Sequence, residues 1–206
     1  MKIQRTANAG VLLTLDDVQI LLDGVCREVN HYLATPPAIA RELLEQKPNV
    51  VAFTHTHADH YSPAYAQACG KEVVLPDGTE KTVSVGSVRM TALPTRHMGK
   101  AGLTDAHQSF VIQGSQSVWF LGDAAPTELK KFTSYPKPDV LMVPYPYIST
   151  PAALRQVEAV LPCKVVLLHL PDPELDPEGL WQSIGPGMAC LKSDLCIPQL
   201  GQTLEL

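Results

Sequence analysis

Seven histidines occur in the chain, and three of them lie with an aspartate inside the stretch THTHADH, residues 54–60. His55 and His57 are two residues apart, so an extended backbone directs both imidazole rings to the same side. Asp59 and His60 follow where the chain turns, so they can face the same space from another direction. Neutral imidazole and carboxylate are ligands that suit zinc, iron or manganese. This crowding predicts a metal-binding loop and disfavours the alternative, a polar surface loop that is rich in histidine by chance.

Three further candidate ligands follow apolar runs elsewhere in the chain. His97 ends SVRMTALPTRH, Asp123 ends SVWFLGD, and His169 lies near the end of KVVLLHL. Each of them alone could equally be a hydrogen-bonded core histidine or a turn aspartate. Because α/β proteins bind ligands at the carboxyl ends of their strands, the three positions and the 55–60 loop together predict one site.

The elements that must position these residues are marked by apolar runs and by helix openings. Nine runs predict β-strands. They cover residues 11–15, 18–23, 49–54, 72–76, 87–95, 109–112, 117–123, 139–144 and 164–170. A capping residue followed by proline predicts helices that open at Thr35, Ser62 and Thr150, and residues 171–187 predict a loop with at most one helix. Strands interleaved with helices indicate an α/β sandwich of packed sheets covered by helices.

Length and composition limit the class of protein. The 206 residues suffice for one domain with a full core, so we expect a single domain over residues 1–206. A net charge of −5 with scattered positive residues disfavours nucleic-acid binding. The N-terminal segment does not resemble a secretory signal, and no apolar stretch reaches the roughly 18 residues of a membrane span. Five cysteines without a C-x-x-C pair indicate reduced, mostly buried thiols, and we expect a cytoplasmic protein.

The order of the candidate ligands resembles the signature of the metallo-β-lactamase superfamily. That signature is H-x-H-x-D-H, a distant histidine, a Gly-Asp after an apolar strand and a histidine after another. The matching residues are His55, His57, Asp59, His60, His97, Asp123 and His169. The runs VLLTL and VQILLDG also resemble the first hairpin of that fold, with Asp23 as the acid that supports the ligands. The resemblance implies an αββα four-layer sandwich with a binuclear metal site between the sheet edges.

The resemblance also implies which residue binds which metal. The first metal would be bound by His55, His57 and His97, the second by Asp59, His60 and His169, with Asp123 bridging both. Two divalent cations are implied, zinc in the first place, with manganese or iron(II) as alternatives. True β-lactamases have cysteine or histidine where this chain has Asp123, which argues against antibiotic hydrolysis. The Thr-Arg-His at 95–97 is similar to small lactonase- and phosphodiesterase-like zinc hydrolases.

The implied reaction is hydrolysis of a small ester, lactone or phosphodiester. Two cations about 3.5 to 4 Å apart share a bridging water, and zinc lowers the pKa of bound water to about 7. A hydroxide nucleophile is then present without a protein base. Asp59 is the predicted catalytic residue, because one oxygen can bind metal while the other accepts a hydrogen bond from that hydroxide.

Four further residues are candidate contacts for a small-molecule substrate: His107, Arg96, Tyr61 and Tyr145. The arginine could clamp an anion, and a tyrosine could donate a hydrogen bond to an oxyanion. Ordinary roles remain open for all four, such as surface ion pairing or aromatic packing. The short loops 24–36, 98–107 and 171–190 should frame an open groove.

Two other functions remain open. An iron-dependent oxidoreductase or dioxygenase of the same fold is one, although His57 stands where flavodiiron-like sites bring a carboxylate. A non-catalytic metal-binding module is the other. The seven candidate ligands argue against it, because a structural zinc site needs only four.

Overall fold

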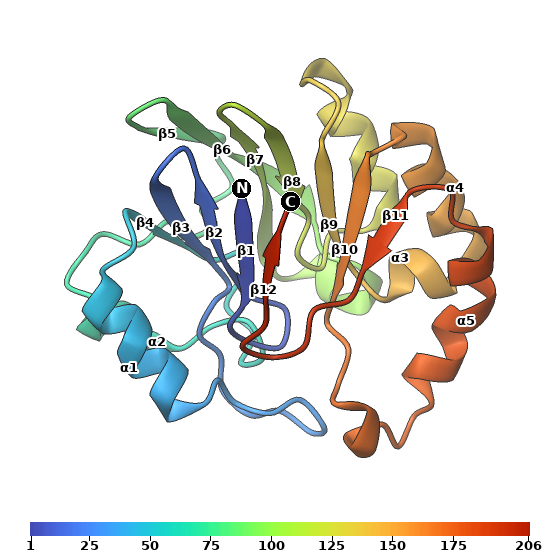
Figure 1. Cartoon of the computed structure of the whole chain (residues 1–206), viewed down its shortest axis with the longest axis horizontal. Helices are drawn as coiled ribbons and strands as arrows, with labels where there is room; N and C mark the ends of the chain where they lie inside the picture. Colours follow the sequence, from blue (N-terminus) through green and yellow to red (C-terminus); the bar gives the residue numbers. More distant parts are fainter.

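Two β-sheets lie face to face in the computed structural model, which describes residues 1–206 (Figure 1). The first sheet has the strand order β12 (Thr203–Glu205), β1 (Lys2–Arg5), β2 (Val11–Leu15), β3 (Val18–Leu22), β4 (Val50–Ala52). The second has the order β11 (Asp194–Cys196), β10 (Lys164–Leu168), β9 (Val140–Pro144), β8 (Ser117–Phe120), β7 (Ala106–Gln113), β6 (Val88–Arg96), β5 (Lys81–Val85). β1 pairs with β12, so the two ends of the chain lie side by side in the first sheet.

The central strands form because both of their faces are buried. Successive side chains of a strand point to opposite faces of the sheet. In β8, Val118 and Phe120 pack between the two sheets, whereas Trp119 packs on the outer face under the helices. β2 repeats this pattern, with Leu13 between the sheets and Leu12 on the outer face. Such strands are almost entirely apolar, which is why the sequence predicted them.

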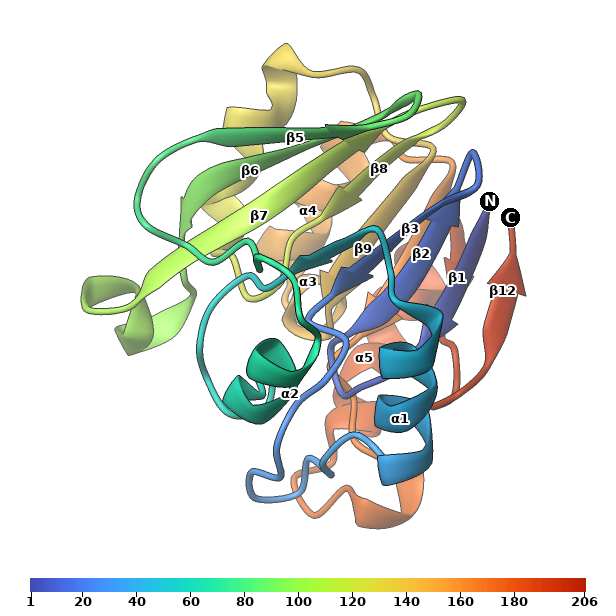
Figure 2. The same cartoon turned by 90° about the vertical axis from the view of Figure 1, so that its left-hand side faces the viewer.

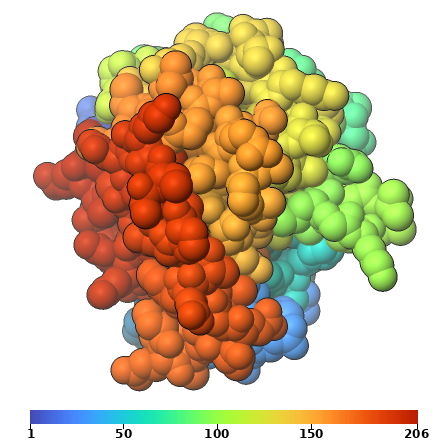
Figure 3. Space-filling view, turned by 90° about the vertical axis from the view of Figure 1, so that its right-hand side faces the viewer, coloured from blue at the N-terminus to red at the C-terminus, as the bar shows by residue number.

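Helices cover the outer face of each sheet, as Figure 2 shows for the first sheet and Figure 1 for the second. In the space-filling view of Figure 3, the late part of the chain, in orange and red, forms much of the surface on the side of the second sheet. The first sheet is covered by α1 (Pro37–Gln46) and α2 (Pro63–Ala68). The second is covered by α3 (Pro146–Ser149), α4 (Pro151–Val160) and α5 (Leu180–Cys190). Three 3-10 helices complete the chain: η1 (Gly99–Leu103), η2 (Pro126–Ser134) and η3 (Pro173–Leu175). The predicted αββα order of layers is therefore confirmed, and none of the helices is long and apolar enough to cross a membrane.

Some local predictions were wrong. Residues 72–76 form no strand, and only Val74 pairs there, in a single bridge with Ala52. Four short strands, β1, β5, β11 and β12, were not predicted. They are three to five residues long and mostly polar, and none of them shows a clear apolar pattern. All five cysteines are unpaired, but Cys163 and Cys190 are exposed and only Cys26 is fully buried, so the thiols are not mostly buried.

The rims of the two sheets are held together at one edge of the sandwich. The main-chain N–H of Gln108 donates to the carbonyl of Thr54 at 2.9 Å and so links the start of β7 to the loop after β4. Gly122, after β8, has a φ of 53° and packs so closely on Thr54 that a Cβ would lie 2.5 Å from that side chain. Only glycine combines this conformation with this approach. The loops that follow β4, β6, β8 and β10 therefore meet at this edge.

Candidate metal centre

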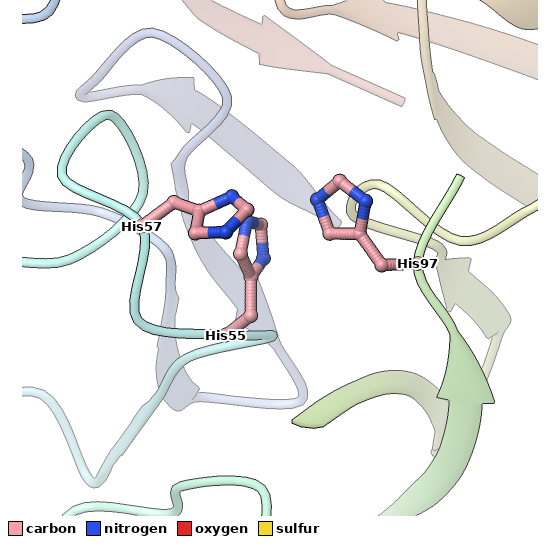
Figure 4. Close-up of side chains that lie close together, drawn as sticks. All are labelled: His55, His57 and His97. Atoms are coloured by element: carbon pink, nitrogen blue, oxygen red, sulfur yellow. The ribbon is translucent and has the colours of Figure 1, made fainter. Parts of the chain in front are cut away.

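All seven predicted ligands come together at this edge. They form three overlapping groups whose nearest ligand atoms lie within 4.8 Å of one another. The groups are His55–His57–His97, His55–His60–Asp123 and Asp59–His60–His169. Figure 4 shows the first of them, with His55 and His57 side by side on one loop and His97 facing them from the end of β6. The predicted residues therefore share one cluster.

A buried carboxylate orients the rings of the 55–60 loop. Asp23 is fully buried and accepts hydrogen bonds from the Thr54 main chain at 2.6 Å, the Thr54 hydroxyl at 2.6 Å and His60 Nδ1 at 2.8 Å. Because the Thr54 hydroxyl donates to Asp23, its oxygen accepts from His55 Nδ1, 2.9 Å away. Both rings then carry their proton on Nδ1, and the Nε2 lone pairs of His55 and His60 point into the cluster.

Main-chain groups orient the residues that come from the second sheet. His97 Nδ1 donates to the carbonyl of Met98 at 2.7 Å, which again leaves Nε2 with a free lone pair. His169 has a φ of 61°, and its N–H donates to the carbonyl of Asn8 at 3.2 Å. Asp123 Oδ2 lies at the middle of the cluster. Its distances to the Nε2 atoms of His60, His97 and His169 are 3.5, 3.5 and 3.6 Å.

His57 and Asp59 form the side of the cluster that faces solvent. His57 Nε2 lies 2.8 Å from Asp105 Oδ2, and the two side chains are 38% and 39% exposed. When His57 Nε2 carries the proton and donates it to Asp105, the lone pair of the His57 ring lies on Nδ1. Asp59 Oδ2 lies 3.2 Å from His169 Nε2. Solvent therefore reaches the cluster on the His57 side.

The donor atoms that face the cluster fit divalent cations. Five of them are buried and have no hydrogen-bond partner: His55 Nε2, His60 Nε2, His97 Nε2, His169 Nε2 and Asp123 Oδ1. Buried polar atoms are rarely left without a hydrogen-bond partner, so five of them in one cluster indicate a bound group. Imidazole nitrogen and carboxylate oxygen are the ligands of zinc and of iron or manganese sites.

The charges in the cluster also favour bound positive charge. Burial opposes ionisation of Asp123, but the surrounding histidines outweigh it and hold the pKa of that carboxyl well below its usual range. Burial likewise opposes protonation of His60, but the carboxylates of Asp123 and Asp23 raise the pKa of its ring. Burial dominates at His55 and lowers the pKa of that ring. The centre thus attracts positive charge, from protons or from metal ions.

Arg5 ties the His169 loop to both ends of the chain, a role that the sequence did not suggest. Its buried guanidinium donates to four main-chain carbonyls, and no carboxylate is paired with it. The acceptors are Ala7 at 3.2 Å, Asn8 at 3.1 Å, Leu170 at 2.8 Å and Pro198 at 3.1 Å. Because Asn8 also accepts the His169 N–H and Leu170 is the next residue, Arg5 positions His169.

His107 supports Asp123, which corrects the prediction that it contacts substrate. The ring is buried, and its Nε2 accepts the main-chain N–H of Asp123 at 3.1 Å. Its Nδ1 then donates to the Thr95 hydroxyl at 2.8 Å, followed by Ser109 at 3.0 Å and the Leu121 carbonyl at 2.8 Å. Burial lowers the pKa of His107 to about 3, so the ring is neutral. No ring nitrogen is free for a substrate.

The other three predicted substrate contacts lie at different distances from the cluster. Arg96 is exposed on the opposite side of β6 from His97, and its guanidinium reaches Thr127 at 3.5 Å. Tyr61 packs edge-on against Phe53, on the side of α1 and α2. Only Tyr145 adjoins the centre, with its ring 6.4 Å from that of His169.

Tyr32 is nearer to the centre and was missed. Its ring contacts His169 edge-on, with ring centroids 4.6 Å apart. Burial, followed by the nearby Tyr145, Asp123 and Asp59, raises the pKa of the phenol, which therefore remains a hydrogen-bond donor. No pattern around residue 32 indicates this, because the contact joins two loops that are far apart in the sequence.

The chain is similar to one described family and to one named protein. The family described as Beta-lactamase superfamily domain matches residues 2–168. A protein named UPF0173 metal-dependent hydrolase from Methanopyrus kandleri is 26% identical over 195 residues, which cover 78% of this chain and 84% of that protein.

Solved structures share the fold. A possible metal-dependent hydrolase from Veillonella parvula superimposes with a TM-score of 0.76 at 14% identity, over 100% of this chain and 99% of that one. An isothiocyanate hydrolase from Delia radicum gut bacteria gives 0.69 at 17% identity, over 100% and 99%. A diiron β-hydroxylase from Streptomyces venezuelae gives 0.65 at 16% identity, over 100% of this chain and 54% of that one.

Proposed function

The chain belongs to the β-lactamase superfamily, and from this premise we propose that it is a metal-dependent hydrolase of a small ester, lactone or phosphodiester. The observation that carries the proposal is the convergence of histidine lone pairs and carboxylates on one cluster that opens to solvent. The curated relative is named a metal-dependent hydrolase, and the Veillonella structure a possible one, which supports the same class.

The residues present would hold two cations. His55, His57 and His97 would bind one, and Asp59, His60 and His169 the other, with Asp123 between them. When bound, such cations supply Lewis acidity and lower the pKa of water, which provides a nucleophile near neutral pH. Zinc suits this donor set, and manganese or iron(II) are the alternatives.

The chain itself orients the reactants and excludes bulk water from most of the site. The Asp59 side chain is 15% exposed and can accept a hydrogen bond from an attacking water, which fixes the direction of attack. Tyr32, which stays protonated beside His169, can donate a hydrogen bond to a substrate oxygen on which negative charge develops. Asp23 and His107 keep the ligands in place and need not touch substrate.

Iron-dependent oxidation is the second candidate, because the diiron β-hydroxylase shares this fold. Histidine at position 57, rather than a carboxylate, favours hydrolysis. A non-catalytic module is less consistent with seven donors, since a structural zinc site is closed with four. We also propose that residues 1–206 form one domain, and that the protein works in the cytoplasm, where five unpaired thiols would stay reduced.

Elemental analysis of the purified protein, combined with a panel of ester, lactone, thioester and phosphodiester substrates, tests the proposal. We expect two equivalents of zinc or manganese and turnover of at least one substrate class. A chelated sample should lose this turnover and regain it when metal is restored. Bound iron with oxygen uptake, and no hydrolysis, would overturn the proposal in favour of oxidation.

A further inference from the structure

A hollow of about 540 Å³ lies beside the metal centre, between the loop after β1, the loop around residue 33, the loop after β10 and the segment before β12. Tyr32, Leu170 and Trp181 line it. A second hollow of about 450 Å³ adjoins it and shares Leu33, Pro173 and Glu174. The volume of the first hollow, even without the second, lies within the range of roughly 300 to 1,000 Å³ that is typical of small-molecule sites.

Two residues connect this hollow to the metal centre. Tyr32 lines the hollow, and its ring also contacts the ring of His169. Leu170, which also lines the hollow, directly follows His169. The hollow and the metal centre are therefore adjacent, and Tyr32 borders both.

Exposed leucines gather around the two hollows. The chain has six large hydrophobic side chains that are exposed, and three of them line the two hollows. They are Leu33 at 49%, Leu175 at 42% and Leu200 at 41% exposure. Exposed apolar side chains gathered around a concave surface indicate a binding site, because their burial by a ligand is favourable.

The charges around the hollows disfavour an anion. Asp172, Glu174 and Asp176 contribute carboxylates to the lining. Arg5 is the one lysine or arginine in it, and four of the five guanidinium N–H groups already donate to main-chain carbonyls. A negatively charged group would therefore meet net negative charge without a free cation.

We infer that the substrate carries an uncharged, mainly apolar group that occupies this hollow while its reactive bond lies at the metal centre. This inference rests on the proposed function and narrows it to substrates whose substituent beside the reactive bond is uncharged and apolar. Substrates with an acidic tail are disfavoured.

A series of 4-nitrophenyl esters tests the inference on the metal-loaded protein. Each methylene buried contributes about 0.8 kcal/mol, so kcat/KM should rise about 15-fold from the butyrate to the hexanoate ester, which is two methylenes longer. The mono-4-nitrophenyl ester of adipic acid, which ends in a carboxylate, should lose this gain. Equal kcat/KM for the hexanoate and adipate esters would overturn the inference.

Two matched variants locate the effect. Leu33→Asp places a charge at the mouth of the hollow and should abolish the preference for the longer ester while leaving bound metal unchanged. Leu161→Asp changes another exposed leucine, at the end of α4 and outside both hollows, and should behave as the parent. If the two variants have the same effect, the hollow is not the site.

A binding measurement separates failure of this inference from failure of the proposed function. If no substrate of the panel is cleaved, the proposed function fails, but occupancy of the hollow can still be measured. The indole ¹⁵N–H resonance of Trp181, assigned with Trp181→Phe, should shift on titration with 4-phenylbutanamide and much less with 4-phenylbutanoate. Trp119, buried under the outer helices, provides the internal control. An unmoved Trp181 resonance, or equal shifts with both compounds, would overturn the inference.

Discussion

The two sheets supply the metal centre in different ways. The first sheet contributes His55, His57, Asp59 and His60 from a single loop, and side chains fix that loop through Asp23 and Thr54. The second contributes His97, Asp123 and His169 from the ends of three strands, and each is fixed by a hydrogen bond that involves a main-chain group, in the case of Asp123 to the His107 ring. We call the ligands from the first sheet the first half of the site and those from the second sheet the second half. The difference teaches that the first half depends on one buried carboxylate, whereas the second half depends on how the strands and loops are placed.

The largest expected effect lies where the two halves meet. Asp123→Asn keeps the shape of the side chain but removes the charge that would offset repulsion between two cations. We expect both metals to bind much more weakly and hydrolysis to be lost, while the far-UV circular dichroism stays that of a folded chain. Titration with zinc and counting of bound equivalents measure this effect.

His169→Ala provides the contrast for that experiment, because it removes one terminal ligand. It should chiefly weaken the second metal and leave one equivalent bound. If Asp123→Asn still binds two metals as tightly as the parent, Asp123 does not bridge them.

The next effect concerns the first half of the site. Asp23→Asn keeps a residue that tolerates the φ of 48° at this position, but it weakens three hydrogen bonds inside a buried charged network. Disruption of such networks costs roughly 3 kcal/mol of unfolding free energy, and loss of a bond to a metal-binding histidine lowers metal affinity about 10- to 100-fold. Urea unfolding and competition with a zinc chelator measure the two quantities. An unchanged chelator competition would show that Thr54 and the loop alone hold the rings.

A smaller effect is expected in the second half of the site, at His107. His107→Phe leaves the Asp123 N–H without a partner and removes one of the two hydrogen bonds of the Thr95 hydroxyl, which costs about 1–3 kcal/mol of unfolding free energy. Metal affinity should also fall, because Asp123 loses the hydrogen bond that positions it. His107→Gln, which retains an acceptor and a donor, should restore part of the affinity. Equal zinc affinity in the Phe and Gln variants would show that His107 fills space without positioning Asp123. Since the pKa of His107 is about 3, the loss should not vary with pH near neutrality.

The smallest effect belongs to the exposed edge of the first half. Asp105→Asn still offers an oxygen to His57 Nε2, and both side chains are more than a third exposed, so solvent screens their interaction. We expect zinc affinity to fall only a few-fold, by less at high salt. A loss of zinc affinity as large as that of Asp23→Asn would show that the exposed Asp105 and the buried Asp23 contribute equally to metal binding.

The sequence revealed the first half of the site more readily than the second. The spacing within residues 55–60 determines which rings share a side, so local geometry was enough to predict a metal loop. His97, Asp123 and His169 are each an isolated residue at a strand end, so only their shared position at strand ends and the superfamily resemblance could group them. The core strands were predictable because they are apolar on both faces. Edge strands such as β12, with the sequence TLE, carry too few apolar residues to be distinguished from loops.

The supports of the second half were not predictable for a related reason. Arg5 and Leu170 are separated by 165 positions, and the contact of Tyr32 with His169 also joins distant loops. Such contacts follow from tertiary structure and leave no local pattern. His107 was detected only as a histidine near a strand, and its sequence neighbourhood does not reveal that both ring nitrogens are engaged.

The guanidinium of Arg5 also bears on the order in which the protein matures. It joins a carbonyl near the start of the chain, one beside His169 and one at Pro198. During synthesis from the N-terminus, the 55–60 loop and Asp23 can come together long before residue 198 has been made. The His169 loop can be fixed by Arg5 only afterwards, and closure over such sequence separations is slow compared with local folding. A nascent chain would therefore acquire the ligands of the first metal well before a stable site for the second.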